Sequence, residues 1–160
     1  MNAALQPHAD SPRLPVEGLT AEARRLPGGK VEVIYRLTGD LEQLLIPELS
    51  DPSRADELWK HTCFEIFILK AEAPGYVEFN FAPSGQWAAY AFAGYREGMT
   101  ELACAPPHID CTVGEGIFEM TVTVALPESL RTVDLVAGFS AVIADIMSRR
   151  EQRIDILVNN

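Results

Sequence analysis

Three short segments in the middle of the chain decide the fold: HTCFEIFILK (61–70), YVEFNFA (76–82) and WAAYAFA (87–93). In the first two segments, apolar side chains recur at every second position, and most of them are aromatic or β-branched, which is typical of strands. The turn sequences Pro74-Gly75 and Pro83-Ser84-Gly85 separate the three segments. The pattern therefore predicts three consecutive strands that are joined by turns.

The same kind of pattern extends on both sides of this centre. Hairpin patterns surround the turns at Pro27-Gly28-Gly29 and at residues 114–116, and a last apolar run covers residues 133–143. No repeat and no long helical segment interrupts these strands. Many short strands separated by turns predict an all-β protein, namely an antiparallel β-sandwich of the immunoglobulin or jelly-roll kind.

The two ends of the chain do not follow this pattern. Residues 1–17 contain three prolines and no hydrophobic periodicity, so we expect a loose N-terminal segment. The sandwich is expected to span residues 18–145. In the tail, residues 146–160, the apolar side chains fit helical spacing and strand spacing equally well, so its conformation is left open.

The composition indicates one soluble, acidic domain. The chain has 160 residues, a formal charge of −10 and an apolar fraction of 48%, which suit a single domain with its own core. The negative charge argues against a nucleic-acid partner and against an anionic membrane surface, since both require clustered Lys and Arg. No apolar segment has the length of a membrane span.

The cysteines and the N-terminus favour a cytoplasmic protein. Cys63, Cys104 and Cys111 form an odd, sparse set without a Cys-x-x-Cys pair, which suits neither a disulfide framework nor a zinc site. Cys104 and Cys111 lie near one another in sequence, but ordinary thiols are the simpler interpretation. The first 14 residues contain no apolar stretch of the kind that a signal peptide needs.

The segments LWKHTCFEIFI (58–68) and YVEFNFAPSGQWAAY (76–90) resemble a known family. They are similar to bacterial DOMON-like domains, which are related to carbohydrate-binding module family nine. The resemblance implies a β-sandwich that binds a small molecule, a sugar or haem, on one face. In these relatives the strand corresponding to residues 133–143 is followed by an aromatic-rich strand and a histidine-bearing segment, and this chain departs from them there.

Strand alternation places several polar and aromatic residues together. Glu65 and His61 share one face of their strand, and Glu78 and Asn80 share one face of the next. If the two faces coincide, flat rings beside them would complete a site for a sugar, which needs polar groups for its hydroxyls and rings for its C–H faces. The candidate ligand-binding residues are therefore Trp59, His61, Glu65, Glu78, Asn80, Trp87 and Tyr90. The alternative is that the rings belong to the core or its rim.

Other chemistries have weaker support in the sequence. Haem would require His61, His108 or Met99 as an axial ligand, and calcium would require the loop that contains Asp51, Asp56 and Glu57. Glu65 and Glu78 could form a glycosidase pair, but two glutamates on neighbouring strands are common in an acidic β-protein. We expect no cofactor and no enzymatic activity, because no acid, base and nucleophile stand out together.

The sequence therefore predicts a non-catalytic module that binds a carbohydrate-like small molecule. Two alternatives stay open: a haem-binding module, and an assembly module that uses an unpaired edge strand to form homo-oligomers.

Overall fold

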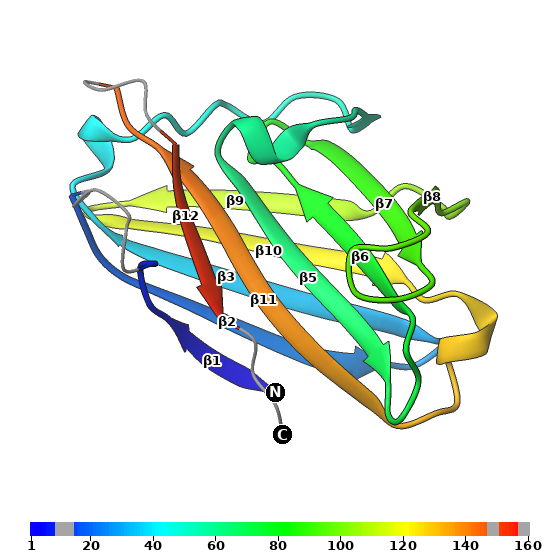
Figure 1. Ribbon diagram of the computed structural model, residues 1–160. Coiled ribbons are helices and arrows are strands. Elements are labelled where there is room, and N and C mark those ends of the chain that lie inside the picture. Colours follow the sequence, from blue (N-terminus) through cyan, green and yellow to red (C-terminus); the bar gives the residue numbers. More distant parts are fainter. Residues whose placement is uncertain (9–14, 147–150, 157–160) are drawn as a thin grey trace.

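Two β-sheets packed face to face make up the protein (Figure 1). The computed structural model describes residues 1–8 and 15–146, and the backbone of residues 151–156. The five-stranded sheet has the order β1 (Asn2–Leu5), β2 (Val16–Leu26), β3 (Lys30–Gly39), β10 (Ile117–Ala125) and β9 (His108–Gly114). All of its neighbouring strands are antiparallel.

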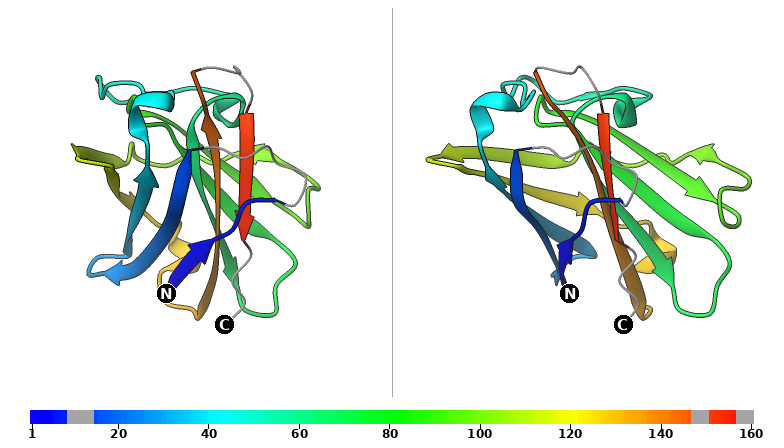
Figure 2. Two further views of the ribbon diagram at one scale, coloured as in Figure 1. Left: turned by 90° about the vertical axis from the view of Figure 1, so that its left-hand side faces the viewer. Right: turned by 60° about the vertical axis from the view of Figure 1, so that its left-hand side comes forward.

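The seven-stranded sheet contains the central segments of the sequence. Its path is β12 (Glu151–Ile156), β11 (Leu135–Ala144), β5 (Cys63–Lys70), β6 (Tyr76–Phe81), β7 (Gln86–Phe92) and β4 (Ser53–Arg54). The short strand β8 (Thr100–Glu101) pairs with β7 off this path. Only the β4–β7 pair is parallel among the described strands. Figure 2 shows the two sheets from the side, and the prediction of an all-β antiparallel sandwich is confirmed.

In the described part of the chain, three single turns of 3-10 helix lie outside the sheets. They are η1 (Leu41–Gln43), η2 (Leu58–Lys60) and η3 (Glu128–Leu130). In the hairpin between β2 and β3, Gly28 and Gly29 have φ angles of +78° and +70°, which other residues rarely adopt. The sequence Pro27-Gly28-Gly29 therefore suits this turn, because glycine adopts such φ angles without strain.

The core lies between the sheets and is built from alternate residues of each strand. Its largest fully buried side chains are aromatic and aliphatic in equal number. The Phe64 and Phe118 rings, one from each sheet, stack with centroids 5.8 Å apart. The Tyr35 hydroxyl donates a 2.7 Å hydrogen bond to the backbone carbonyl of Glu65, and so joins β3 of one sheet to β5 of the other. Burial raises the pKa of Tyr35 well above its ordinary value.

Both ends of the chain contribute strands that hydrophobic periodicity alone does not predict. Residues 2–5 pair with β2 where we expected an irregular segment, and residues 151–156 pair with β11. The conformation of the tail, which the sequence left open, is therefore a strand over 151–156. Edge strands offer unpaired N–H and C=O groups with which a neighbouring segment can pair, and in β1 the Leu5 side chain also packs in the core. Residues 9–14, 147–150 and 157–160 lie outside the described residues.

No helix in the described part of the chain is long and apolar enough to cross a membrane.

Candidate functional site

The side of the seven-stranded sheet that faces away from the core, its outer face, is buried to an unusual degree. In β5, β6, β7 and β11, consecutive residues are buried, whereas β2 and β10 alternate between buried and more exposed positions. Strands buried on both faces read as continuous apolar runs. Here, however, part of the buried outer face is polar.

A row of small and polar residues crosses this outer face in register. Ser140 of β11 is paired with Glu65 of β5, Glu65 with Asn80 of β6, and Asn80 with Ala88 of β7. Glu65 is 3% exposed and Asn80 is fully buried. The Asn80 Nδ2 atom donates a 3.0 Å hydrogen bond to Oε1 of Glu78, which is only half-buried. Glu78 thus connects the buried amide to the surface.

Tyr90 adds an aromatic ring and a hydroxyl to this group. It is 5% exposed and pairs across the strands with Glu78. Its hydroxyl donates a 2.9 Å hydrogen bond to Oδ1 of Asp56, in the loop before η2. Burial, and then the hydrogen bond to Asp56, raise the pKa of Tyr90 far above its ordinary value of 10.0. We call Glu65, Asn80 and Tyr90 the polar floor.

The turn η2 covers one end of the polar floor. Leu58 is buried against Tyr90 and against small residues of the outer face, in a hydrophobic cluster separate from the main core. Trp59, the next residue, is 37% exposed, and its ring meets Tyr90 edge-on with centroids 6.4 Å apart. Figure 1 shows η2 in front of the upper ends of β5 and β6. The buried leucine fixes the turn, and the tryptophan is thereby held beside the floor.

A second aromatic group lies further along the same outer face. Tyr76 and Phe92 are cross-strand partners whose rings stack in parallel, with centroids 4.5 Å apart and an interplanar angle of 7°. The Phe67 ring meets Tyr76 edge-on at 6.1 Å. All three side chains are half-buried. Together with Trp59 and Glu78 they form what we call the rim of the floor.

The structure brings together five of the seven candidate ligand-binding residues: Trp59, Glu65, Glu78, Asn80 and Tyr90. Trp87 lies elsewhere, because it faces the core between the sheets, where the Arg54 guanidinium carbon is 4.3 Å from its ring centroid. Trp87 and Tyr90 are three residues apart on one strand, and strand geometry directs such residues to opposite faces. His61 is exposed and precedes β5, at the end of η2.

Phe67, Tyr76 and Phe92 are not among the ligand-binding residues predicted from the sequence. The signal was nevertheless present, since Phe67 and Tyr76 have the same strand parity as Glu65 and Glu78. Phe92 joins them because the short turn between β6 and β7 sets the register that pairs it with Tyr76.

Among the residues considered for haem or metal binding, Asp56 and His108 have partners within the protein. Asp56 accepts the hydrogen bond from Tyr90. His108 contacts Asp110 at 2.8 Å on the other sheet. All three cysteines are free thiols: Cys63 is buried, and Cys104 and Cys111 are half-buried. Within the described residues, no three His, Cys, Asp or Glu side chains converge in a way that could hold a metal ion.

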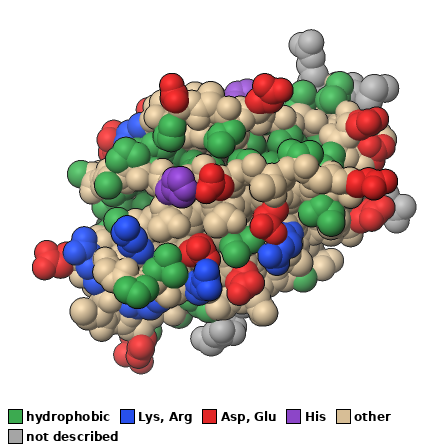
Figure 3. Space-filling model, turned by 180° about the vertical axis from the view of Figure 1, so that it is seen from behind, with side chains coloured by type: hydrophobic (Ala, Val, Ile, Leu, Met, Phe, Trp, Pro, Cys, Tyr) green, Lys and Arg blue, Asp and Glu red, His purple; other side chains and the backbone are tan. Residues whose placement is uncertain are grey.

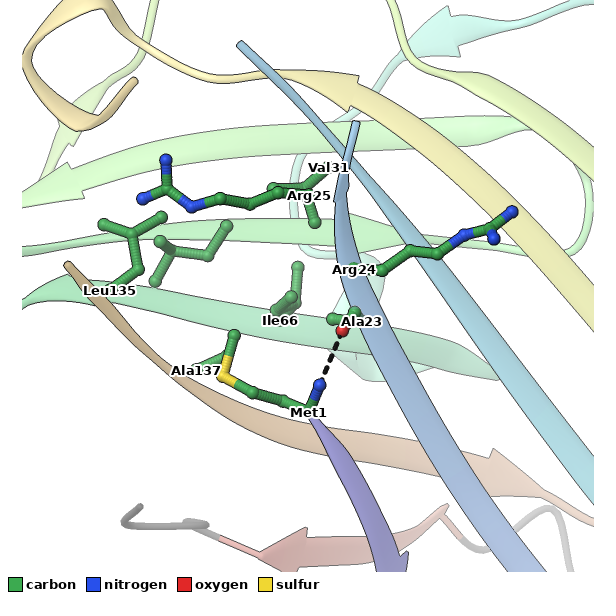
Figure 4. A pocket seen from close by; sticks show the side chains of 9 residues that line it. Met1, Ala23, Arg24, Arg25, Val31, Ile66, Leu135 and Ala137 are labelled. Carbon is green, nitrogen blue, oxygen red and sulfur yellow. Dashed lines mark hydrogen bonds between the residues drawn. The ribbon is translucent and has the colours of Figure 1, made fainter. Parts of the chain in front are cut away.

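Two hollows elsewhere on the molecule fit a sugar less well. Figure 4 shows an apolar cavity between the sheets, where the Met1 ammonium donates a hydrogen bond to the carbonyl of Ala23. Its volume of about 10 Å³ is no more than one water needs. A larger groove of about 410 Å³ lies over β1, β2 and β3, but no aromatic side chain lines it.

The fold and this face define a class of protein: an antiparallel β-sandwich with a polar floor and an aromatic rim on one outer face. No known protein family matches the sequence, and no curated protein matches it either. A crystal structure of a candidate carbohydrate-binding protein from Bacteroides uniformis has a similar fold, with a TM-score of 0.64 and 12% sequence identity. The similarity covers 100% of this chain and 79% of the other, and at this identity it shows the fold alone.

Proposed function

We propose that the protein is a non-catalytic module that binds a small, carbohydrate-like ligand on the outer face of its seven-stranded sheet. One observation carries the proposal. The Asn80 carbonyl oxygen, Oδ1, is buried and has no hydrogen-bond partner. Buried polar atoms are nearly always satisfied, so this exception calls for an explanation. A ligand group that reaches the floor would supply the missing bond.

The surroundings of Asn80 suit a polyol. Sugars combine hydroxyl groups, which carboxylates and amides bind, with apolar C–H faces, which pack on aromatic rings. Glu78 and the rings of Trp59 and Tyr76 stand at the rim, between the buried floor and solvent. The described similarity to a candidate carbohydrate-binding protein supports the same assignment.

Two finer assignments belong to this proposal. The sandwich architecture, with the segments at 58–68 and 76–90 on its outer face, supports membership of the DOMON-like domains related to carbohydrate-binding module family nine. The three free thiols support a reducing, cytoplasmic setting.

Isothermal titration calorimetry against a broad panel of mono- and oligosaccharides tests the proposal. We expect binding of at least one sugar, and a loss of about tenfold or more in affinity for Trp59→Ala. Ile117→Ala, on the outer face of the other sheet, serves as the matched control and should bind like the wild type. No binding by the folded wild-type protein, or equal binding by Trp59→Ala, would overturn the proposal.

A further inference from the structure

The polar floor is closed to solvent in this structure. Asn80 is fully buried, and its carbonyl oxygen has almost no exposed surface. The turn η2 lies against β5, β6, β7 and β11, the four central strands of this outer face (Figure 1). A ligand group can therefore bond to the Asn80 oxygen only after a covering element has moved, and η2 covers the face without being a strand of either sheet.

An apolar contact and a hydrogen bond hold η2 against the sheet. Leu58 packs with Ala88 and Tyr90 in the cluster that is separate from the main core. The Tyr90 hydroxyl donates its 2.9 Å hydrogen bond to Asp56, just before η2. Because both contacts lie outside the core between the sheets, η2 can leave the outer face while the sandwich stays folded.

The two ends of this segment differ in how firmly they are held. After η2, the buried Thr62 hydroxyl donates a 2.6 Å hydrogen bond to the carbonyl of Leu45 and accepts a 3.1 Å hydrogen bond from the N–H of Ala144. Before η2, Glu57 has a φ of 58° and a ψ of 30°, in the left-handed region that residues with a Cβ disfavour. Glu57 loses this strain when η2 moves, so it suits a hinge, and Thr62 is the fixed point.

We infer that η2 is a lid, which swings away from the outer face to admit the ligand to the Asn80 oxygen and then closes over it with Trp59. This inference rests on the proposed function and adds the route by which the ligand enters. Trp59 directly follows the anchor Leu58, so closure of the lid carries its ring to the ligand. A closed lid also keeps water away from the bound ligand, which strengthens the hydrogen bonds beneath it.

Cys63 reports the position of the lid. Its thiol is buried in the same cluster as Leu58, at the start of β5. A thiol reagent reaches it only when η2 has moved or when the whole protein has unfolded. Urea separates these two routes, because global unfolding exposes much more surface than local opening and so depends more steeply on urea. Cys104 and Cys111, which are half-buried and pack against the main core, are the internal controls.

Thiol labelling of the ligand-free protein tests the lid by itself. Initial rates are measured site by site by mass spectrometry over a range of low urea concentrations. We expect the rate at Cys63 to be nearly independent of urea, as local opening requires. A rate that follows the full urea dependence of global unfolding overturns the inference, and the proposed function then stands or falls on calorimetry.

Tyr90→Phe tests the hydrogen bond that holds the lid. Without this bond the open state is populated more, so we expect Cys63 to be labelled about fivefold faster in the range where labelling does not depend on urea. Tyr95→Phe is the matched control, because Tyr95 is exposed on the loop after β7, and should label at the wild-type rate. Equal rates in the two variants overturn the role of the bond to Asp56.

Sugars complete the test. The probes are D-glucose, D-galactose, D-mannose and N-acetyl-D-glucosamine, each at increasing concentration. A sugar that binds under the closed lid should slow labelling of Cys63 about tenfold when its concentration is about ten times its dissociation constant, and leave Cys111 unchanged. If a sugar binds in calorimetry without slowing Cys63, the lid is overturned and the proposed function stands. No binding of any sugar in calorimetry overturns both.

Discussion

The two outer faces of the sandwich differ although both belong to antiparallel sheets. On the five-stranded sheet, exposed charges pair with one another, as Arg24 does with Glu32 and Arg36 with Glu119. Figure 3 shows acidic and basic side chains mixed with apolar ones on that side of the molecule. On the seven-stranded sheet, the corresponding positions hold buried polar groups between aromatic rings.

The outer face of the seven-stranded sheet contains a feature that stability alone does not require, namely a buried polar group without a partner. A solvated sheet face costs little, because its polar groups keep their water. A buried amide with an unsatisfied oxygen is costly, by about 1–3 kcal/mol. Among the described residues this cost falls on the outer face of the seven-stranded sheet, and it is the reason why we propose a ligand for that face.

Ala88→Glu should give the largest difference between the faces. Ala88 is 1% exposed and pairs with Asn80, so the new carboxylate would be buried beside Glu78. We expect a loss of about 3–5 kcal/mol, as for other uncompensated buried charges. The matched control is Ala4→Glu, exposed on the five-stranded sheet, which should change the free energy of unfolding by less than about 0.5 kcal/mol.

Urea unfolding measures both variants. Equal stability of the two glutamate variants would show that the outer face of the seven-stranded sheet is open to water, contrary to the structure.

Leu58→Ala should have the next largest effect. Leu58 is the buried anchor of η2, and Leu→Ala changes in cores cost about 2–5 kcal/mol. Because the turn is short and can collapse into the gap, we expect about 2–3 kcal/mol, together with weaker sugar binding. Ile117→Ala, 47% exposed on the other sheet, should be nearly neutral.

Thiol labelling gives a local measurement of the same change. Cys63 packs in the Leu58 cluster, and burial raises the pKa of its thiol well above the ordinary value. Leu58→Ala should therefore accelerate labelling of Cys63 under native conditions. Labelling at the wild-type rate would mean that η2 does not cover the face.

Tyr90→Phe should have a smaller effect. It removes the hydrogen bond to Asp56 and leaves a buried ring, so we expect a loss of about 1 kcal/mol in urea unfolding. Tyr95→Phe is the control, since Tyr95 is 75% exposed and should tolerate the change. A loss of similar size in both variants would contradict the assigned role of the Tyr90 hydroxyl.

The smallest effect is a pH dependence at the alkaline end. The raised pKa of Tyr90 means that the folded state favours the protonated phenol. Its contribution to stability is present below pH about 10, the ordinary value for tyrosine, and declines as the pH rises above it. Urea titrations at pH 10 and at about one pH unit above it measure this loss. Over that range the free energy of unfolding should fall more for the wild type than for Tyr90→Phe. Parallel curves would contradict this linkage.

Much of the fold could be predicted because strand alternation is a local property. Phe64, Ile66 and Ile68 recur at every second position, and their strand lies where the pattern places it. The strands at residues 2–5 and 151–156 could not be predicted in this way, since they form by backbone pairing along the edges of β2 and β11.

The candidate site could be predicted only in part. Glu65 and Asn80 meet because the turn between β5 and β6 sets their register, which alternation and turn signals together indicate. The prediction that Trp87 joins Tyr90 in the site is wrong, because residues three apart on one strand point to opposite faces and Trp87 packs in the core. The placement of Trp59 depends on the non-local contact of Leu58 with the sheet, which no sequence period encodes.

The hydrogen bond from Tyr35 to the carbonyl of Glu65 has a mechanical consequence. It crosses the core at the residue that forms part of the polar floor, so β3 and β5 cannot slide past one another without breaking it. The stacked rings of Phe64 and Phe118 join the same strand, β5, to β10 of the other sheet. A directional polar bond and an apolar contact therefore fix the register between the two layers directly beneath the polar floor.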